Sequence, residues 1–227
     1  MKEYQQCYFA FLDLLGFKQL INIKTCSEIV RIFDEVMKQI IINEIFNDKT
    51  EKPVIPAEDI HYYIMSDSVC IFIKDDIELA LPVLTFLCLY FQVRMLCLED
   101  PVLVRGSISR GNIYENDNIL FGPAMVDAYI GSEKLAHFPR VIIPAQLYNE
   151  LSEQKDKSIL DGIVYQDQDG FYATQYIDYF CNHNSTINYR DHVYNYIKDI
   201  LNSTIEPTVK QKYMYVETLL DYYKKES

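Results

Sequence analysis

The sequence has few cations, no long apolar run and no recognisable leader. Its 21 lysine and arginine residues are outnumbered by 33 aspartate and glutamate residues, which gives a formal charge of −12. A general nucleic-acid binder needs a basic face for phosphates, so this balance argues against a nucleic-acid partner. No apolar run reaches the roughly 18 residues of a membrane span, and the start MKEYQQC lacks the basic and apolar regions of a signal peptide. We therefore expect no membrane partner.

The six cysteines form no CxxC pair and show no zinc-ligand spacing. Most of them lie inside apolar segments, where a free cysteine behaves as a small core residue. Reduced cysteines are typical of a reducing compartment, so we expect a cytoplasmic protein.

The 227 residues, 49% of them hydrophobic, are enough to bury one core of moderate size. Strand patterns are predicted at 7–15, 60–74, 102–121 and 140–144. Helical patterns lie between them at 17–47, 77–98 and 122–136, the second capped by Asp75 or Asp76. This order predicts a ferredoxin-like α+β fold, with helices on one face of a mostly antiparallel sheet and the other face open.

The composition changes after about residue 145. The later segments predict a helix at 145–154, a hairpin around 167–170 and tyrosine-rich helices at 190–202 and 206–225. We therefore expect a core over residues 1–145 and a C-terminal extension over 146–227, packed on the same domain. The tyrosines either pack on the core or contribute to a dimer interface, where aromatic residues are enriched.

Asp13 is a carboxylate in an otherwise apolar strand and is closely followed by a glycine. An unpaired carboxylate in an apolar setting is costly, so a partner or a metal is expected. The predicted hairpin would bring Asp67, at its tip, next to Asp13. Two adjacent carboxylates repel each other unless a cation lies between them, and their oxygens suit Mg²⁺ or Mn²⁺. The alternative is that Asp13 caps a helix and Asp67 is a turn residue.

The residues after Asp13 are suited to binding phosphate groups. The strand is predicted to turn into a helix at Leu15, Gly16 and Phe17, so their backbone amides could cradle phosphates. Lys18 would add a positive charge. A ligand that carries phosphate groups is therefore a candidate for this end of the strand.

Four motifs within residues 8–144 resemble those of class III nucleotide cyclases. FLDLLGF is similar to the first metal motif of that family, and IMSDSVCIF to the second. VRGSISRG resembles the pattern Arg-x-Gly-Ile-x-x-Gly, with serine for the first glycine. FGPAMVDAYIGSEKLA resembles the helix Gly-x-x-Val-Asn-x-Ala-x-Arg. The order and spacing of the four motifs match the family.

The resemblance implies that residues 1–145 are a catalytic domain acting as a head-to-tail homodimer, with sites at the interface. Two Mg²⁺ or Mn²⁺ ions on Asp13 and Asp67, with the Leu14 carbonyl as a further ligand, would serve the reaction. They would activate the ribose 3′-hydroxyl of a nucleoside triphosphate for attack on its α-phosphate, with release of pyrophosphate.

The chain departs from the family at the base and arginine positions. Tyr63 replaces the lysine that reads adenine, and the acidic partner falls on Ile119, with Asn118 beside it. The arginine that steadies the transition state falls on Ile130, which leaves Arg110 as the nearest substitute. Tyr63 could stack on or hydrogen-bond a pyrimidine, or it is a strand tyrosine that packs against the sheet.

This profile most resembles the compact pyrimidine cyclases of the bacterial anti-phage systems called Pycsar. Those enzymes make cyclic CMP or cyclic UMP for a separate effector. The resemblance implies a cyclase acting on UTP or CTP. The other hypothesis is a catalytically degenerate cyclase-like module that binds a nucleotide or a partner, because the usual arginine and phosphate-binding lysine are missing.

Overall fold

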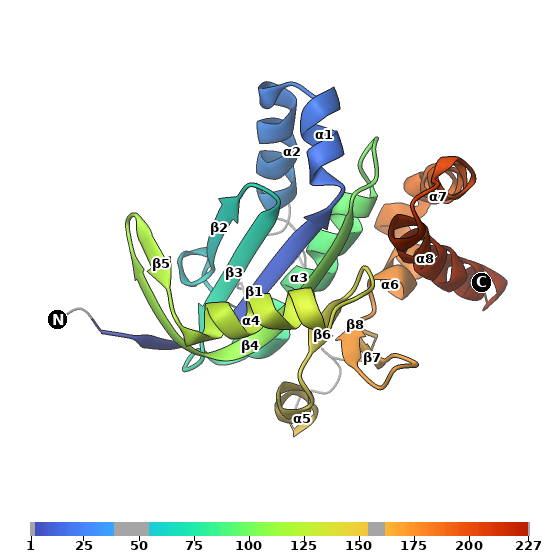
Figure 1. Cartoon of the computed structure of the whole chain (residues 1–227). Coiled ribbons are helices and arrows are strands. Elements are labelled where there is room, and N and C mark those ends of the chain that lie inside the picture. The colour runs from blue at the N-terminus through green and yellow to red at the C-terminus, as the bar shows by residue number, and fades with distance from the viewer. Residues whose placement is uncertain (1–2, 39–54, 154–161, 227) are drawn as a thin grey trace.

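The computed structural model describes residues 3–38, 55–153 and 162–226 (Figure 1). One eight-stranded sheet organises them, in the order β2-β3-β1-β4-β6-β8-β7, with β5 paired to β4. The strands are β1 (Gln5–Leu15), β2 (His61–Met65), β3 (Ser68–Lys74), β4 (Leu103–Asn116), β5 (Ile119–Phe121), β6 (Val141–Ile143), β7 (Val164–Gln166) and β8 (Tyr172–Thr174). Only the β4–β6 pairing is parallel among the described strands.

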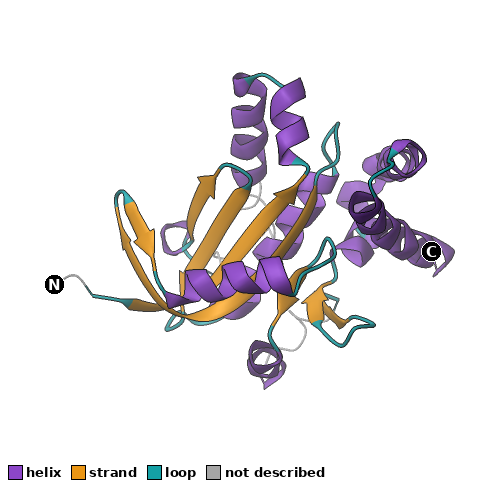
Figure 2. Cartoon of the chain, in the orientation of Figure 1, coloured by secondary structure: helices purple, strands orange, loops and turns teal. Residues whose placement is uncertain are grey.

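Helices lie on both sides of this sheet (Figure 2). They are α1 (Phe17–Ile23), α2 (Cys26–Lys38), α3 (Ala80–Leu96), α4 (Pro123–Lys134), α5 (Ala145–Glu153), α6 (Tyr176–Asn182), α7 (Arg190–Ser203) and α8 (Pro207–Glu226), with short 3₁₀ turns at Ala57–Asp59 and Asn184–Tyr189. The predicted α+β class and mostly antiparallel sheet are confirmed. No helix among the described residues has the length and hydropathy that crossing a bilayer requires.

Strand β1 is central and is buried on both faces. It pairs antiparallel with β3 on one side and with β4 on the other. Its even residues, such as Ala10 and Leu12, pack toward α3, whereas its odd residues Phe9 and Phe11 pack toward α4. Because successive side chains of a strand point to opposite faces, burial of both faces requires a continuous apolar run. This explains why the residues before Asp13 form a continuous apolar run.

The face that we expected to be open is partly covered by α4. Ala124 and Ala128 of this helix are fully buried against β1 and β3, and Ser109 Oγ donates a hydrogen bond of 2.7 Å to the Ala124 carbonyl. A Cβ on Gly131 would lie 2.4 Å from Ser107 Oγ. The small residues therefore let the helix approach the sheet closely, which the prediction of helices on one face missed.

Two helix boundaries differ from their predictions. Helix α3 begins at Ala80, after Leu79 in a left-handed conformation with φ 63°. Neither Asp75 nor Asp76 caps it, because Asp75 binds Arg110 on β4 instead. The helix predicted to reach residue 47 is described only as far as Lys38, and residues 39–47 lie outside the described residues.

Five of the six cysteines are buried and none forms a disulfide. Burial raises the pKa of Cys70 to about 12, and burial followed by the charge of Asp75 raises the pKa of Cys7 to about 11. These thiols therefore stay protonated, as expected for core residues. Cys26 at the start of α2 is the exposed exception.

The C-terminal extension continues the sheet and adds a helical layer. Strand β8 pairs with β6, so the predicted hairpin around 167–170 becomes the edge of the main sheet. Helices α6, α7 and α8 pack around Phe180, Val193 and Val216, in one cluster with Leu89 and Val93 of α3. The helices predicted at 190–202 and 206–225 are confirmed within one or two residues at each end.

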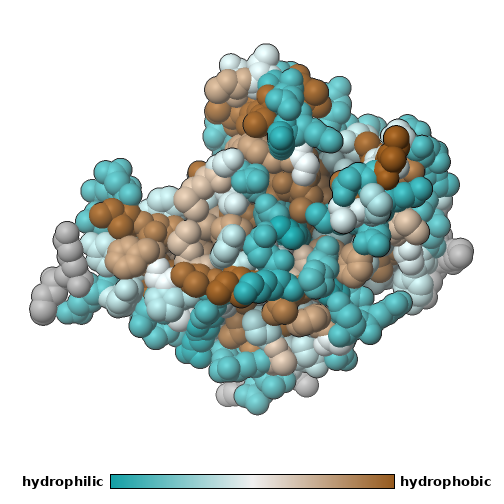
Figure 3. All heavy atoms as spheres, in the orientation of Figure 1, coloured by the Kyte–Doolittle hydropathy of each residue, from teal (hydrophilic) through white to brown (hydrophobic). Residues whose placement is uncertain are grey.

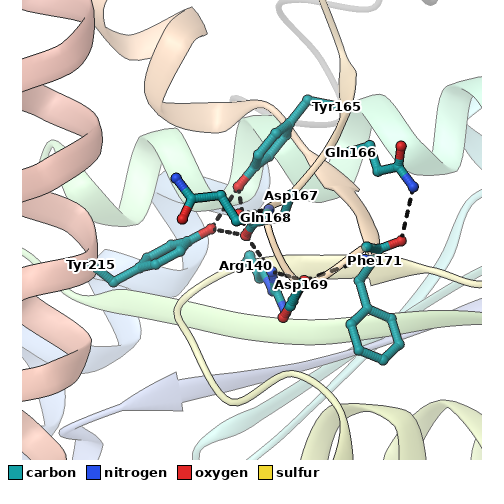
Figure 4. Close-up of polar contacts among 9 residues, drawn as sticks. Arg140, Tyr165, Gln166, Asp167, Gln168, Asp169, Phe171 and Tyr215 are labelled. Atoms are coloured by element: carbon teal, nitrogen blue, oxygen red, sulfur yellow. Dashed lines mark hydrogen bonds and ion pairs between the residues drawn. The ribbon is translucent and has the colours of Figure 1, made fainter.

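A buried arginine ties the extension to the core (Figure 4). Arg140, just before β6, is 1% exposed and forms ion pairs with Asp167 and Asp169 of the β7–β8 hairpin. Its guanidinium also lies over two aromatic rings, those of Phe138 and Phe171. Tyr215 of α8 donates a hydrogen bond of 2.6 Å to Asp167 Oδ2. We call Arg140, Tyr165, Asp167, Asp169 and Tyr215 the Arg140 cluster.

Replacing Arg140 by methionine should destabilise the fold strongly. The substitution leaves Asp167 without its buried cation, and breaking such a pair costs roughly 3–5 kcal/mol. Urea unfolding measures the loss. Arg31→Met, at an exposed ion pair with Glu35, is the matched control and should change stability by about 0.5 kcal/mol or less. Equal losses in the two variants would contradict a stabilising role for the Arg140 cluster.

Candidate active site

Asp13 and Asp67 lie on adjacent strand ends. Asp13 is near the end of β1, and in the β1–β3 register it faces Ser68, the residue after Asp67. The Leu14 amide donates a hydrogen bond of 2.8 Å to the Asp67 carbonyl. Asp67 occupies an exposed turn with Ser66, whose φ of 57° is left-handed. The structure thus brings the two residues together as the hairpin prediction implies.

The carboxylate of Asp13 has a charge partner on the neighbouring strand. Arg105 of β4 is its register partner, and Arg105 Nε donates a hydrogen bond of 2.7 Å to Asp13 Oδ2. The same guanidinium contacts Glu133 of α4. Asp13 and Arg105 are each 16% exposed, so this pair is only partly hydrated. The alternative of Asp13 as a helix cap is wrong, because Gly16 is the N-cap of α1 and no side chain bonds it.

The donor set at this end of the sheet fits a hard divalent cation. Hydrogen bonds among the described residues occupy only Oδ2 of Asp13, and the Asp67 carboxylate is solvent-exposed. The Leu14 side chain has no donor atom, so its backbone carbonyl is the one group of this residue that could be a ligand. No group of three or more histidine, cysteine or acidic side chains suited to a metal occurs within the described parts of the chain. Mg²⁺ commonly takes one or two carboxylates and completes its shell with water and substrate phosphates, and this site suits that mode.

The turn after β1 has the form expected of a phosphate loop. Gly16 alone separates β1 from α1, with φ 85°, a conformation that strains other residues. A Cβ built on Gly16 would meet nothing within 4 Å, so the backbone is approachable there. Leu15 and Phe17 pack into neighbouring hydrophobic clusters, and Lys18 is exposed. Phosphate binding by these four residues stays a prediction.

Tyr63 has a polar partner that the sequence did not reveal. Its hydroxyl donates a hydrogen bond of 2.8 Å to Glu115 Oε1, and His61 Nδ1 lies 2.9 Å from Glu115 Oε2. Burial, and then this hydrogen bond, raise the pKa of Tyr63. Its ring stacks on Phe72, so the strand-packing role is also observed.

Glu115 belongs to the end of β4 that runs into the hairpin with β5. This hairpin curls over the sheet toward β2 (Figure 1), which brings Glu115 to Tyr63 from a strand three positions away in the sheet order. Asn118 lies exposed in the hairpin turn. The spacing of the family motifs places the acidic residue that reads the base at Ile119. The side chain of Ile119 is exposed on β5.

The structure does not bring Arg110 to the two aspartates. Arg110 is five residues from Arg105 on β4, about 16 Å at roughly 3.3 Å per residue. An odd offset also places it on the opposite face of the sheet. There it binds Asp75 at 2.8 Å and Glu150 at 3.4 Å. The prediction that Arg110 substitutes for the transition-state arginine is therefore wrong for this site.

Solved structures with a similar fold include nucleotide cyclases. The catalytic core of a rhodopsin-guanylyl cyclase with converted specificity, in complex with ATPαS, matches with a TM-score of 0.51 and 9% identity, over 75% of this chain and 96% of that one. The adenylyl cyclase CyaB from P. aeruginosa matches with a TM-score of 0.49 and 12% identity, over 76% and 94%. No protein-family model and no curated protein sequence matches the chain. At 9% identity the first likeness establishes a shared fold.

Replacing Arg105 should lower the free energy of unfolding more than neutralising Asp13 does. Arg105→Ala leaves Asp13 and Glu133 without their shared cation, whereas Asp13→Asn leaves Arg105 paired with Glu133. Hydrogen bonds to charged groups contribute roughly 1.5–3 kcal/mol, so we expect a loss of that order for Arg105→Ala and a smaller one for Asp13→Asn. Chemical denaturation measures both. Equal or reversed losses would contradict this assignment of the ion pairs.

Proposed function

We propose that the chain is a nucleotide cyclase that converts a nucleoside triphosphate to a 3′,5′-cyclic nucleotide and pyrophosphate. The observation that carries the proposal is the position of Asp13 and Asp67 on adjacent strand ends, in a fold shared with the guanylyl cyclase core. Two Mg²⁺ or Mn²⁺ ions, when bound there, would activate the ribose 3′-hydroxyl and neutralise the triphosphate.

The chain's own residues would bind and orient the phosphates. Asp13 would exchange Arg105 for a cation, and the released guanidinium would face the phosphates while keeping its contact with Glu133. A guanidinium suits this role because it binds phosphate in a bidentate manner. The amides after β1 and the exposed Lys18 would contact the same groups.

A pyrimidine base, of UTP or CTP, is the substrate class we propose. Glu115 offers a carboxylate acceptor beside Tyr63 for an N–H group of the base, which every nucleobase presents on its pairing edge. Asn118 adds an amide in the adjoining turn. The replacement of the adenine-reading lysine by Tyr63 supports this choice. The product would then act on a separate effector in anti-phage signalling.

A head-to-tail homodimer would complete the site. Apolar side chains gather on the face that carries α4 and the β4–β5 hairpin (Figure 3). Val126, Tyr129 and Ile130 of α4 are 40–54% exposed, as are Ile119 and Phe121 of β5. An exposed apolar surface of this kind is typical of a protein interface. Its α4 part lies near Asp13, because the Tyr129 ring packs on Phe11 with centroids 5.3 Å apart, so a second copy seated here would cover the site.

The second candidate is a catalytically degenerate module that binds a nucleotide without turnover. Two observations favour it: Asp13 is already paired with Arg105, and Arg110 is engaged on the other face.

Replacing either aspartate should abolish turnover while the fold is retained. Asp67→Asn and Asp13→Asn remove the charges that hold the cations, so we expect losses of at least about 1000-fold, roughly 4 kcal/mol of transition-state stabilisation. Cyclic product and pyrophosphate are measured with Mn²⁺ and each of ATP, GTP, CTP and UTP. Asp34→Asn, on the exposed side of α2, is the matched control. Full activity of Asp67→Asn would overturn the mechanism, and triphosphate binding without turnover in the wild type would favour the degenerate module.

Mixing two inactive variants should restore activity if the sites are shared between subunits. In a head-to-tail dimer of Tyr63→Ala with Asp67→Asn, one of the two sites contains both groups intact. Random pairing makes half of the dimers mixed, so recovery approaches about one quarter of the wild-type rate. Turnover of the mixture, compared with that of each variant alone, measures it. Absence of recovery would contradict the shared site and the role of Tyr63.

A further inference from the structure

Helix α8 of the C-terminal extension passes the end of the sheet that carries Asp13. Leu15 and Leu103 are register partners, one position along the same face from the pair of Asp13 and Arg105. Both leucines belong to the hydrophobic cluster that contains Val216 and Leu220 of α8. Membership of this shared cluster therefore places Val216 and Leu220 of α8 toward the end of the sheet that carries the two charged residues.

The side of α8 that faces the core also includes a lysine. Residues three or four apart on a helix share a face, and Lys212 precedes Tyr215 and Val216 by that spacing. Val216 is fully buried, and Tyr215 is held by Asp167 and by the ring of Phe138, whose centroid lies 4.7 Å away. Lys212 is accordingly half-buried, unlike the exposed Lys210 on the same helix.

The surroundings of Lys212 are the charged groups of the candidate site. Burial and then the charge of Arg105 lower the pKa of Lys212, while Asp13, Glu206 and Glu133 raise it. Among the described residues none forms a salt bridge with Lys212. Lys212 is thus a half-buried ammonium within electrostatic range of Asp13 and Arg105, and no anion of the described residues is in salt-bridge contact with it.

We propose that Lys212 binds the triphosphate of the substrate, and that α8 is thereby part of the active site. This inference rests on the proposed function. The ammonium would lie on the α4 side of the sheet, beyond the Asp13–Arg105 pair. There it would add a positive charge next to the triphosphate, in addition to that of Arg105. The extension would then supply, within the same chain, a phosphate contact that the four sequence motifs lack.

Binding of non-cyclisable nucleotides tests this role without any turnover. The probes are the 3′-deoxy forms of ATP, GTP, CTP and UTP and the corresponding monophosphates, with Mn²⁺, measured by titration calorimetry. Lys212→Met should weaken triphosphate binding roughly tenfold or more, the size of one charge-assisted contact, and change monophosphate binding less than about twofold. Lys212→Arg should retain most of the affinity. Lys210→Met, two residues away on the exposed side, should match the wild type.

Any other result contradicts either the role of Lys212 or the cyclase proposal itself. Unchanged triphosphate binding in Lys212→Met, or an equal loss for triphosphate and monophosphate, would reduce Lys212 to a structural residue and leave the cyclase proposal standing. If the wild type neither binds nor cyclises any triphosphate, both proposals fall. Should Lys212→Met fail to fold, Lys212→Gln, which keeps a polar end, serves as the variant with the same expected selectivity.

Discussion

The ion pair between Asp13 and Arg105 is the interaction on which the rest of the site depends. It joins the central strand β1 to β4 at their register positions, and through Glu133 it extends to α4. A carboxylate that is only 16% exposed needs a cationic partner, and Arg105 supplies it to Asp13. The proposed chemistry requires that this pair opens. A divalent cation would take the place of the guanidinium on Asp13, which frees Arg105 for the phosphates.

The position of the C-terminal extension relative to this site depends on the Arg140 cluster. The Arg140 cluster fixes the β7–β8 hairpin to the core, and the hydrogen bond from Tyr215 to Asp167 fixes α8 to that hairpin. Lys212 lies one turn before Tyr215 on the same helix face. These contacts help to determine where α8 lies. If Lys212 binds the triphosphate as proposed, the Arg140 cluster also determines the position of that contact.

Local patterns in the sequence predicted much of the fold and the core of the site. The apolar run of β1, the hairpin that carries Asp67 and the turn at Gly16 each depend on neighbouring residues, and the structure has all three. The failures depend on longer-range geometry. Glu115 reaches Tyr63 because the β4–β5 hairpin curls over the sheet, which no spacing reveals. Arg110, in contrast, could have been excluded from the alternation of β4 alone, since an odd offset from Arg105 reverses its face. The α4 helix was predicted, but not the face that its small residues cover.

The exchange of Arg105 for a cation on Asp13 is the central claim, and one structure tests it most directly. Crystals of the wild-type protein grown with Mn²⁺ and a 3′-deoxy nucleoside triphosphate would locate the metal by its anomalous scattering. The account predicts a metal peak between Asp13 and Asp67, with Arg105 turned from Asp13 to the phosphates. A bound triphosphate with the Asp13–Arg105 pair still closed, and no metal on either aspartate, would contradict it.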